Sequence, residues 1–513
     1  MPSYRRFTYF FLLFSISIMA FIMLFNLIID PLGIWKIFNV KGVNEYKPQQ
    51  YSHQRLYKAV DLMKQKSDTI FLGNSKVQNG LDPEGYQALT GEKAYNLGLG
   101  GSTMEEQLRY LEHALYNDPS IKNVVMGIDF RSFNSNRTNV GDFDPNRLSK
   151  SSIFFTKDAI LTTLTFDAIR LSYSTIIANK QGGDQHSFFE HNGKRSEFTI
   201  QQENQGRKAI DVFGGYIHAS LKDPSIYGQY QLSQKHLMYF QAIVDICKES
   251  NLQLKVFISP SHVTLLESIR NAGHWNLFEQ WKREIAEITP YWDFYYYNSI
   301  TNEPINDNMK YYWDSTHYKK EVGNMVLSKM YDLGKNGIPS NFGVYVTKEN
   351  IENHLQTTRR LRDFPNYLDP DSAALVKNIY NELTKSSTRS PVYSMKEMAL
   401  RENINWSLDS SAAGIKYVKF PLADLPNFSD APLSLQKEKA VMKTIQGTPI
   451  THIVNTSWRA GQANEFYITE KEVIISVENS VTGWGEGVVP SASEIKAYFA
   501  KAPYSFTYII QLN

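Results

Sequence analysis

The hydrophobic positions of the chain begin with one continuous apolar run over residues 7–29, in which Asn26 is the only strongly polar side chain. The run is long enough for a helix to span the hydrocarbon core of a bilayer. Arg5 and Arg6 precede it and the next charge is Asp30, so the positive-inside rule predicts a cytoplasmic N-terminus and an exported remainder. We expect an uncleaved single-pass anchor. A cleaved signal sequence and a buried core helix are the alternatives, and no small-residue cleavage motif ends the run.

Beyond residue 65, short apolar runs alternate with amphipathic stretches. Thr103, followed three residues later by Glu106, is typical of a capping box at a helix start, and Gly273 predicts a break inside a later helix. Strands alternating with helices predict an α/β fold with a mostly parallel sheet covered on both faces. Strands are expected at 69–73, 92–97, 123–128, 254–259 and 292–297, and helices at 104–116, 230–250, 265–288 and 320–333.

Two stretches depart from this alternation. Residues 134–230 hold one long helical pattern, at about 156–179, and then polar sequence with scattered glycines, which predicts an insertion over the edge or mouth of the sheet. Past residue 340 the pattern indicates a small α+β module of unknown role. Its expected loops are at 386–391 and 422–433, and its expected strands at 473–477 and 506–511. The predicted units are an anchor at 1–30, an α/β domain at 31–340 and this module at 341–513.

Charge and cysteine content narrow the classes of partner. The chain has 54 basic and 52 acidic residues, and this balance gives no basis for binding nucleic acid. A single cysteine, Cys247, excludes an intramolecular disulfide and a multi-cysteine metal site. The histidines show no paired spacing typical of a zinc site. We therefore expect neither a metal nor a cofactor.

Two short segments carry candidate catalytic residues. Gly73-Asn74-Ser75 directly follows the first expected strand, and parallel sheets bind ligands outside the carboxyl ends of their strands. Ser75 is therefore a candidate nucleophile, with an ordinary helix N-cap as the alternative. Asp314 and His317 follow the last expected strand. An imidazole can act as the base for a serine, and a carboxylate can orient that imidazole.

A third segment, Gly98 to Ser102, is a glycine-rich turn after the second expected strand. Such a turn can aim backbone N–H groups at an oxyanion, and an ordinary turn is the alternative. Gly98 and Gly101 are the candidate donors. His262 follows a later strand at the same edge of the sheet. It either lines the cleft or is a structural loop histidine.

The order of these segments resembles that of the SGNH or GDSL-like hydrolases, over about residues 65 to 340. The resemblance implies Ser75 as nucleophile, His317 as base and Asp314 as the group that orients it, with Gly98 or Gly101 in the oxyanion hole. The sequence departs from the family in having Asn74 where an Asp is usual.

The second departure concerns the third block of the family, which usually supplies an Asn to the oxyanion hole. Asp129 stands there in this sequence. A carboxylate would repel a developing oxyanion unless it were protonated or turned away. Arg131 and Asn134 follow Asp129 closely and are alternative donors.

The layout of an anchor, an exported domain and a late Asp-x-x-His is also similar to that of membrane-anchored proteins that assist envelope acylation, such as the D-alanyl teichoic acid transfer and alginate O-acetylation proteins. This resemblance implies an acylated polysaccharide or glycan as substrate and a membrane-bound O-acyltransferase as partner. Three functions stay open: an O-acyltransferase, an esterase, and a non-catalytic envelope scaffold on a degenerate fold of this type.

Overall fold

The computed structural model describes residues 2–139, 141–148, 152–181, 186–334, 337–364 and 368–386, and after them the backbone of strands β7 to β14. The loops predicted at 386–391 and 422–433 lie, apart from residue 386, outside the described residues.

The central sheet has six strands in the order β2-β1-β3-β4-β5-β6. The first five are parallel, and β6 runs antiparallel to β5 at one edge. The mostly parallel α/β fold predicted from the sequence is therefore confirmed. The bounds are β1 Thr69–Gly73, β2 Ala94–Asn96, β3 Asn123–Ile128, β4 Gln253–Ile258, β5 Tyr291–Asp293 and β6 Val344–Val346.

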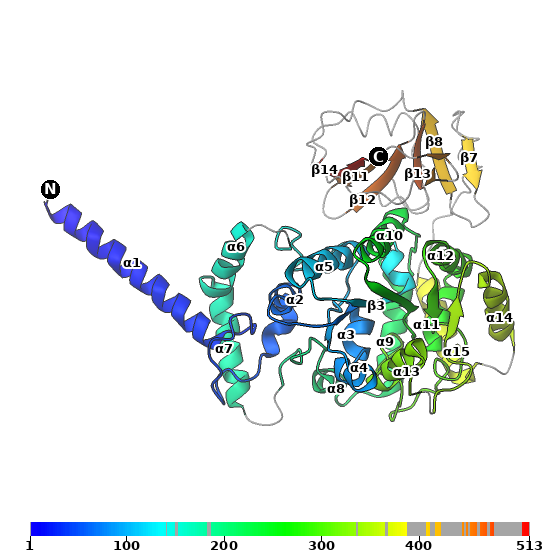
Figure 1. Ribbon diagram of the computed structural model, residues 1–513, viewed down its shortest axis with the longest axis horizontal. Coiled ribbons are helices and arrows are strands. Elements are labelled where there is room, and N and C mark those ends of the chain that lie inside the picture. Colours follow the sequence, from blue (N-terminus) through cyan, green and yellow to red (C-terminus); the bar gives the residue numbers. More distant parts are fainter. Residues whose placement is uncertain are drawn as a thin grey trace.

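Helices cover both faces of this sheet (Figure 1). Successive side chains of a strand point to opposite faces, so Ile70 and Leu72 pack into one apolar cluster with α5, α10, α11 and α12, whereas Phe71 packs into a second cluster with α3, α4 and α13. The bounds are α2 Gln54–Leu62, α3 Ser75–Gly80, α4 Pro83–Thr90, α5 Met104–Asn117, α10 Gln234–Glu249, α11 Val263–Asn271, α12 Trp275–Ile288, α13 Lys320–Tyr331, α14 Ile351–Asp363 and α15 Pro370–Ser386, with 3-10 turns η1 Pro48–His53 and η2 Phe130–Phe133.

Local side-chain chemistry sets several element ends. Thr103 caps α5, because its Oγ1 accepts a hydrogen bond from the Glu106 amide (3.2 Å), as its sequence predicts. The expected break at Gly273, which has a φ of +81°, separates α11 from α12. The strand expected at 292–297 ends early, because the Asp293 carboxylate accepts the Tyr295 amide (2.8 Å) and turns the chain.

The insertion holds four helices among its described residues: α6 Ser152–Thr163, α7 Phe166–Lys180, α8 Glu197–Asn204 and α9 Ala209–Lys222. The single helix predicted at 156–179 is wrong. Thr165 Oγ1 accepts the Ala168 amide (3.1 Å) and starts α7 as a new helix. Asn134 pairs with Leu232 in an isolated bridge, so the chain leaves and rejoins the α/β domain at one place.

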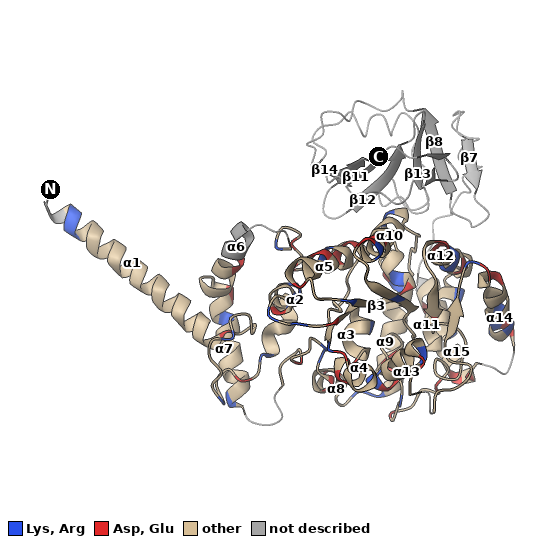
Figure 2. Cartoon of the chain, viewed as in Figure 1, with Lys and Arg blue, Asp and Glu red and all other residues tan. Residues whose placement is uncertain are grey.

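The first helix, α1 Pro2–Ile29, is the one helix among the described residues that is long and apolar enough to cross a membrane. Figure 2 shows its charged side chains confined to its N-terminal end. The opposite end is fixed to the rest of the chain. Asn44 Nδ2 donates to the Ile28 carbonyl (2.8 Å), and Lys47 Nζ donates to the Ile29 carbonyl (2.8 Å).

Beyond residue 340, β6, α14 and α15 still pack with the α/β part, past the predicted boundary. Leu355 of α14 joins the main apolar cluster, and Val376 of α15 packs against Ile217 of α9. A separate antiparallel sheet follows in the order β14-β11-β12-β13-β8-β7. Its strands are β7 Ser407–Ser410, β8 Lys416–Pro421, β11 His452–Trp458, β12 Gln462–Ile468, β13 Glu472–Ser476 and β14 Ser505–Gln511, so the two strands expected here are found within one residue. Strands β9 Thr444–Ile445 and β10 Thr448–Pro449 pair with each other in a separate antiparallel sheet.

Candidate active site

The candidate site lies at the carboxyl edge of the sheet, where the strand order reverses between β1 and β3. Open α/β sheets bind ligands at such a switch point, because the connections leave the two strands in opposite directions and open a crevice. The two strands pair in register, with Gly73 opposite Gly127. Ser75 and Asp129, each two residues further along, therefore leave the sheet side by side.

A hydrogen-bonded chain joins Ser75, His317 and Asp314. Ser75 Oγ lies 2.8 Å from His317 Nε2, and His317 Nδ1 lies 2.8 Å from Asp314 Oδ2. An ionised carboxylate only accepts hydrogen bonds, so the imidazole proton belongs on Nδ1 and leaves Nε2 free to accept the Ser75 proton. Asp314 is buried, and its other oxygen accepts the amides of Thr316 (2.7 Å) and His317 (2.9 Å).

The turn after β1 presents Ser75 because of the two residues before it. A Cβ on Gly73 would lie 2.7 Å from the Gly127 carbonyl oxygen, so only glycine fits this close approach. Asn74 caps α3, with its Oδ1 accepting the Lys76 amide (3.0 Å). The N-cap role considered for Ser75 therefore belongs to Asn74, and the Ser75 hydroxyl is free to face His317.

The relative position of Ser75 and His317 depends on the close packing of α3 and α13. A Cβ on Gly323 would overlap the Gly80 carbonyl oxygen, so the two helices touch through their backbones. His317 sits three residues before α13, in a tight hairpin closed by the Trp313 amide on the His317 carbonyl (2.9 Å). These contacts bring together two segments that are 242 residues apart in the chain.

The two glycines predicted as oxyanion donors differ in their surroundings. The Gly98 amide donates to Asn96 Oδ1 (2.9 Å) and is already engaged. Gly101 has a φ of +68°, and within the part of the chain that the structure describes its amide donates to no partner. Gly101 is thus the donor that the geometry leaves available.

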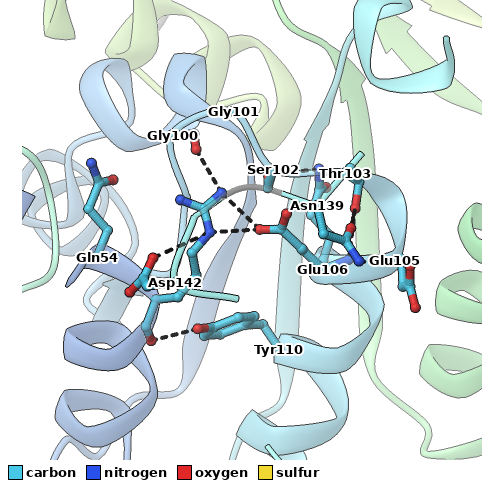
Figure 3. A network of polar contacts seen from close by, with 12 residues as sticks. Gln54, Gly100, Gly101, Ser102, Thr103, Glu105, Glu106, Tyr110, Asn139 and Asp142 are labelled. Carbon is cyan, nitrogen blue, oxygen red and sulfur yellow. Dashed lines mark hydrogen bonds and ion pairs between the residues drawn. The ribbon is translucent and has the colours of Figure 1, made fainter. Parts of the chain in front are cut away.

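Figure 3 shows the network of polar contacts around Gly100, Gly101 and Glu106. In this network Arg55 holds the peptide plane that carries the Gly101 amide. Its Nη2 donates to the Gly100 carbonyl (2.9 Å), and its Nε donates to Glu106 (2.9 Å). In a trans peptide the N–H points opposite to the preceding C=O, so fixing the Gly100 oxygen also fixes the direction of the Gly101 N–H. The Arg137 guanidinium donates to the Gly101 carbonyl, which belongs to the next peptide plane along the chain.

Asp129 is buried, and its charge is balanced. Its Oδ2 lies 3.1 Å from Lys76 Nζ, while its Oδ1 accepts the Ser132 amide (3.0 Å) and hydroxyl (2.5 Å). Burial alone would raise the pKa of Asp129, but the Lys76 charge and the Ser132 hydroxyl hold that pKa well below its usual range. The repulsion expected from an unpaired carboxylate is therefore offset by Lys76.

Arg131 and Asn134, the other predicted donors, differ in whether their side chains are already engaged. Arg131 is half-buried, and its Nε has no hydrogen-bond partner among the described residues. Asn134 is fully buried and donates to the carbonyls of Pro224 (2.7 Å) and Ile226 (2.9 Å), so its amide hydrogens hold the insertion and are not available to an oxyanion.

His262 is a structural histidine, the second of the two alternatives predicted for it. It is fully buried at the start of α11, between the rings of Phe213 and Tyr312, and its Nε2 lies 2.6 Å from the Glu303 carbonyl. Burial lowers the pKa of His262 to about 4, so the ring is neutral at neutral pH.

Tyr216 of α9 is a site residue that the sequence did not indicate. Its ring meets the His317 imidazole edge to face, with centroids 5.7 Å apart. The nearby Asp314 carboxylate, together with burial, raises the pKa of Tyr216 above its ordinary value, so the hydroxyl keeps its proton. In the sequence, Tyr216 was marked only by its place in an insertion expected over the edge or mouth of the sheet.

Comparison of the sequence with models of protein families and with curated proteins finds no match. The resemblance to SGNH-like hydrolases stays a prediction, and the chemistry of the site rests on its geometry.

We expect Lys76→Met to lower the free energy of unfolding by about 3–5 kcal/mol, because it leaves the Asp129 carboxylate buried without a counter-charge. Denaturant unfolding of the detergent-solubilised chain, followed by tryptophan fluorescence, measures this. The matched control is Lys76→Met with Asp129→Asn, which should recover most of the loss. A single variant as stable as the double variant would contradict the role of the pair.

The contribution of the Lys76–Asp129 pair to the free energy of unfolding depends on pH. The pKa of Asp129 is lower in the folded chain than in the unfolded chain, so its contribution to stability is complete above the unfolded value of about 4. We expect this contribution to be lost as the pH falls below about 4. Unfolding of the wild type and of Asp129→Asn at pH 5 and pH 3 measures it. A difference between the two proteins that does not shrink at the lower pH would contradict the assignment.

Proposed function

We propose that the chain is a membrane-anchored serine acyl-transfer enzyme of the SGNH type, acting outside the cytoplasm on an acylated glycan. The hydrogen-bonded chain from Ser75 through His317 to Asp314 carries this proposal. A serine paired with a base, and a base paired with a buried carboxylate, is the arrangement that activates a hydroxyl nucleophile.

The reaction has two steps that share one set of groups. His317 Nε2 takes the Ser75 proton as Ser75 Oγ bonds to the acyl carbonyl carbon. The resulting oxyanion accepts hydrogen bonds from the amides of Gly101 and Ser75. The C–O bond to the leaving alcohol breaks, and that alcohol takes the proton from His317. An acceptor hydroxyl then gives its proton to His317 as its oxygen bonds to the acyl carbon. The bond from that carbon to Ser75 Oγ breaks, and His317 returns the proton to Oγ.

The location and the surroundings of the site support a glycan substrate. An apolar α1 preceded by Arg5 and Arg6 supports a membrane anchor with a cytoplasmic N-terminus, and the domain would then lie in the envelope, where polysaccharides and a membrane-bound O-acyltransferase would be within reach. Tyr216 offers a partly exposed ring beside His317, and such rings stack on sugar faces. The Tyr216 ring of α9 covers one side of the His317 imidazole and so limits the approach of water to the acyl-serine from that side. This favours transfer to a sugar hydroxyl over hydrolysis.

A non-catalytic scaffold is the second candidate. One observation favours it: the position that usually holds an amide donor carries Asp129, which is committed to Lys76. A scaffold of this kind would keep the fold and the glycan-binding surface without forming an acyl-serine.

Ser75→Ala should abolish labelling by a fluorophosphonate probe, because that probe needs an activated serine oxygen. Gel fluorescence of the labelled full-length chain measures this. Ser315→Ala is the matched control, since Ser315 is buried in the same region and its hydroxyl has no hydrogen-bond partner among the described residues. It should label like the wild type. Labelling that survives in Ser75→Ala would remove Ser75 from the role, and a wild type that does not label would favour the scaffold.

Asp314→Asn should lower the rate of p-nitrophenyl acetate cleavage by about 10³–10⁴-fold with little change in folding. An amide at this position can donate to Nδ1, which moves the imidazole proton to Nε2 and leaves no base for Ser75. Steady-state kinetics, with circular dichroism as the folding check, tests this. An unchanged kcat would show that Asp314 does not orient the base.

Arg55→Lys should lower kcat by about 10–100-fold and leave KM nearly unchanged, because the Gly101 N–H would lose its fixed direction only where the oxyanion develops. Arg55 is a positioning residue, so the split between kcat and KM separates this role from a general loss of structure. Arg109→Lys, on an ion pair with Glu112 of α5, is the control. Equal effects of the two substitutions would contradict the proposal.

A further inference from the structure

Helices α6 and α7 carry an exposed apolar stripe that the proposed chemistry does not use. Phe166, at the start of α7, is 91% exposed. A soluble surface rarely holds several large apolar side chains together, and such patches mark contacts with membranes or other proteins. The stripe consists of Ile160, Leu161, Leu164, Phe166 and Tyr173, all of them exposed.

The opposite sides of the same helices are fixed to α1. Asn26, the one strongly polar side chain of the apolar run, is completely buried between them. Its Nδ2 donates to the Thr163 carbonyl (2.9 Å), and its Oδ1 accepts the Ser172 hydroxyl (2.7 Å). A polar amide beside lipid needs such internal partners, so α6 and α7 satisfy Asn26.

This contact sets the position of the stripe along the anchor. Asn26 lies three residues before the end of α1, which corresponds to about 5 Å of helix. Figure 1 shows α6 and α7 beside that end of α1. The junction of the two helices, with Leu164 and Phe166 exposed, is therefore at the level where the α1 apolar surface leaves the bilayer.

A second apolar segment lies at the same level. Ile37, Phe38 and Val40 lie eight to eleven residues beyond the end of α1 and are exposed. Asn44 folds this loop back onto α1, because its Nδ2 donates to the Ile28 carbonyl (2.8 Å) and also to the Phe38 carbonyl (3.1 Å). Exposed apolar side chains thus adjoin the outer end of the anchor on two segments.

We propose that the stripe on α6 and α7, together with the 37–40 loop, lies in the outer interface of the bilayer with its side chains among lipid acyl chains. The proposal rests on α1 spanning the membrane, as in the proposed function. Lipid is the occupant because α6 and α7 pack against α1, so the exposed apolar side chains of the stripe adjoin the exposed apolar surface of α1. The domain therefore contacts the membrane surface directly, in addition to being anchored by α1.

Lipid-depth quenching of the full-length chain tests this. Cys247→Ser removes the single, buried cysteine, and one new cysteine at a time then carries an environment-sensitive dye in phosphatidylcholine vesicles containing doxyl-labelled lipid. Phe166→Cys reports the stripe, and Ile18→Cys, on the exposed face of α1, reports the anchor. Tyr345→Cys, at the half-exposed edge strand β6, is the control. Fluorophosphonate labelling of each variant monitors the candidate site separately.

We expect the dye at Phe166→Cys and at Ile18→Cys to lose about half of its emission to doxyl lipid, and the dye at Tyr345→Cys to keep it. Quenching at Ile18→Cys without quenching at Phe166→Cys would overturn the inference and leave the anchor intact. No quenching at either position would remove the anchor as well. A Phe166→Cys dye that doxyl lipid does not quench in vesicles, but that native membranes shield from aqueous iodide, would identify a protein as the occupant and overturn the lipid assignment.

Discussion

The ion pair between Lys76 and Asp129 is the constraint on which the candidate site depends. Both groups are buried, and neither charge is tolerated there without the other. Lys76 follows Ser75 directly, and Asp129 directly follows β3, so the pair joins helix α3 to the end of the neighbouring strand. Asn74 Nδ2 and Ser132 Oγ add a parallel link through one neutral hydrogen bond.

A second set of cations acts on backbone carbonyls. Arg55 and Arg137 hold the carbonyls of Gly100 and Gly101, and Lys58 donates to those of Asn96 and Gly193. The contacts on Gly100, Gly101 and Gly193 remove rotational freedom from segments outside the strands, and the contact on Asn96 lies at the end of β2. Burial lowers the pKa of Lys58 to about 7, so its amine is partly neutral at neutral pH and still donates to these oxygens. The contacts of Arg55 and Arg137 thus hold the turn of Gly100 and Gly101 in one conformation.

Much of this architecture was readable from the sequence, because local patterns specify it. Buried strands bounded by glycine, and helices with a capping residue, predicted the sheet and the helices on its two faces. Gly73, Ser75, Asp314 and His317 were visible because residues after parallel strands converge at one edge. Tyr216 and the partner of Asp129 were not visible, because they depend on how distant segments pack. The break at Thr165 was missed because a threonine inside an apolar run reads equally well as helix interior and as N-cap.

The attachment of α1 has a mechanical consequence. Asn44 and Lys47 cap its last carbonyls, and Asn26 is sealed between α6 and α7, so no flexible tether separates anchor and domain. A tethered domain samples a volume set by its linker, and its effective concentration toward a target falls with linker length. With α1 as the membrane anchor that we propose, the domain would instead have a fixed orientation and almost no reach. The proposed glycan would then have to come to the domain, and the height of Ser75 above the lipid would decide which part of the polymer meets the hydroxyl.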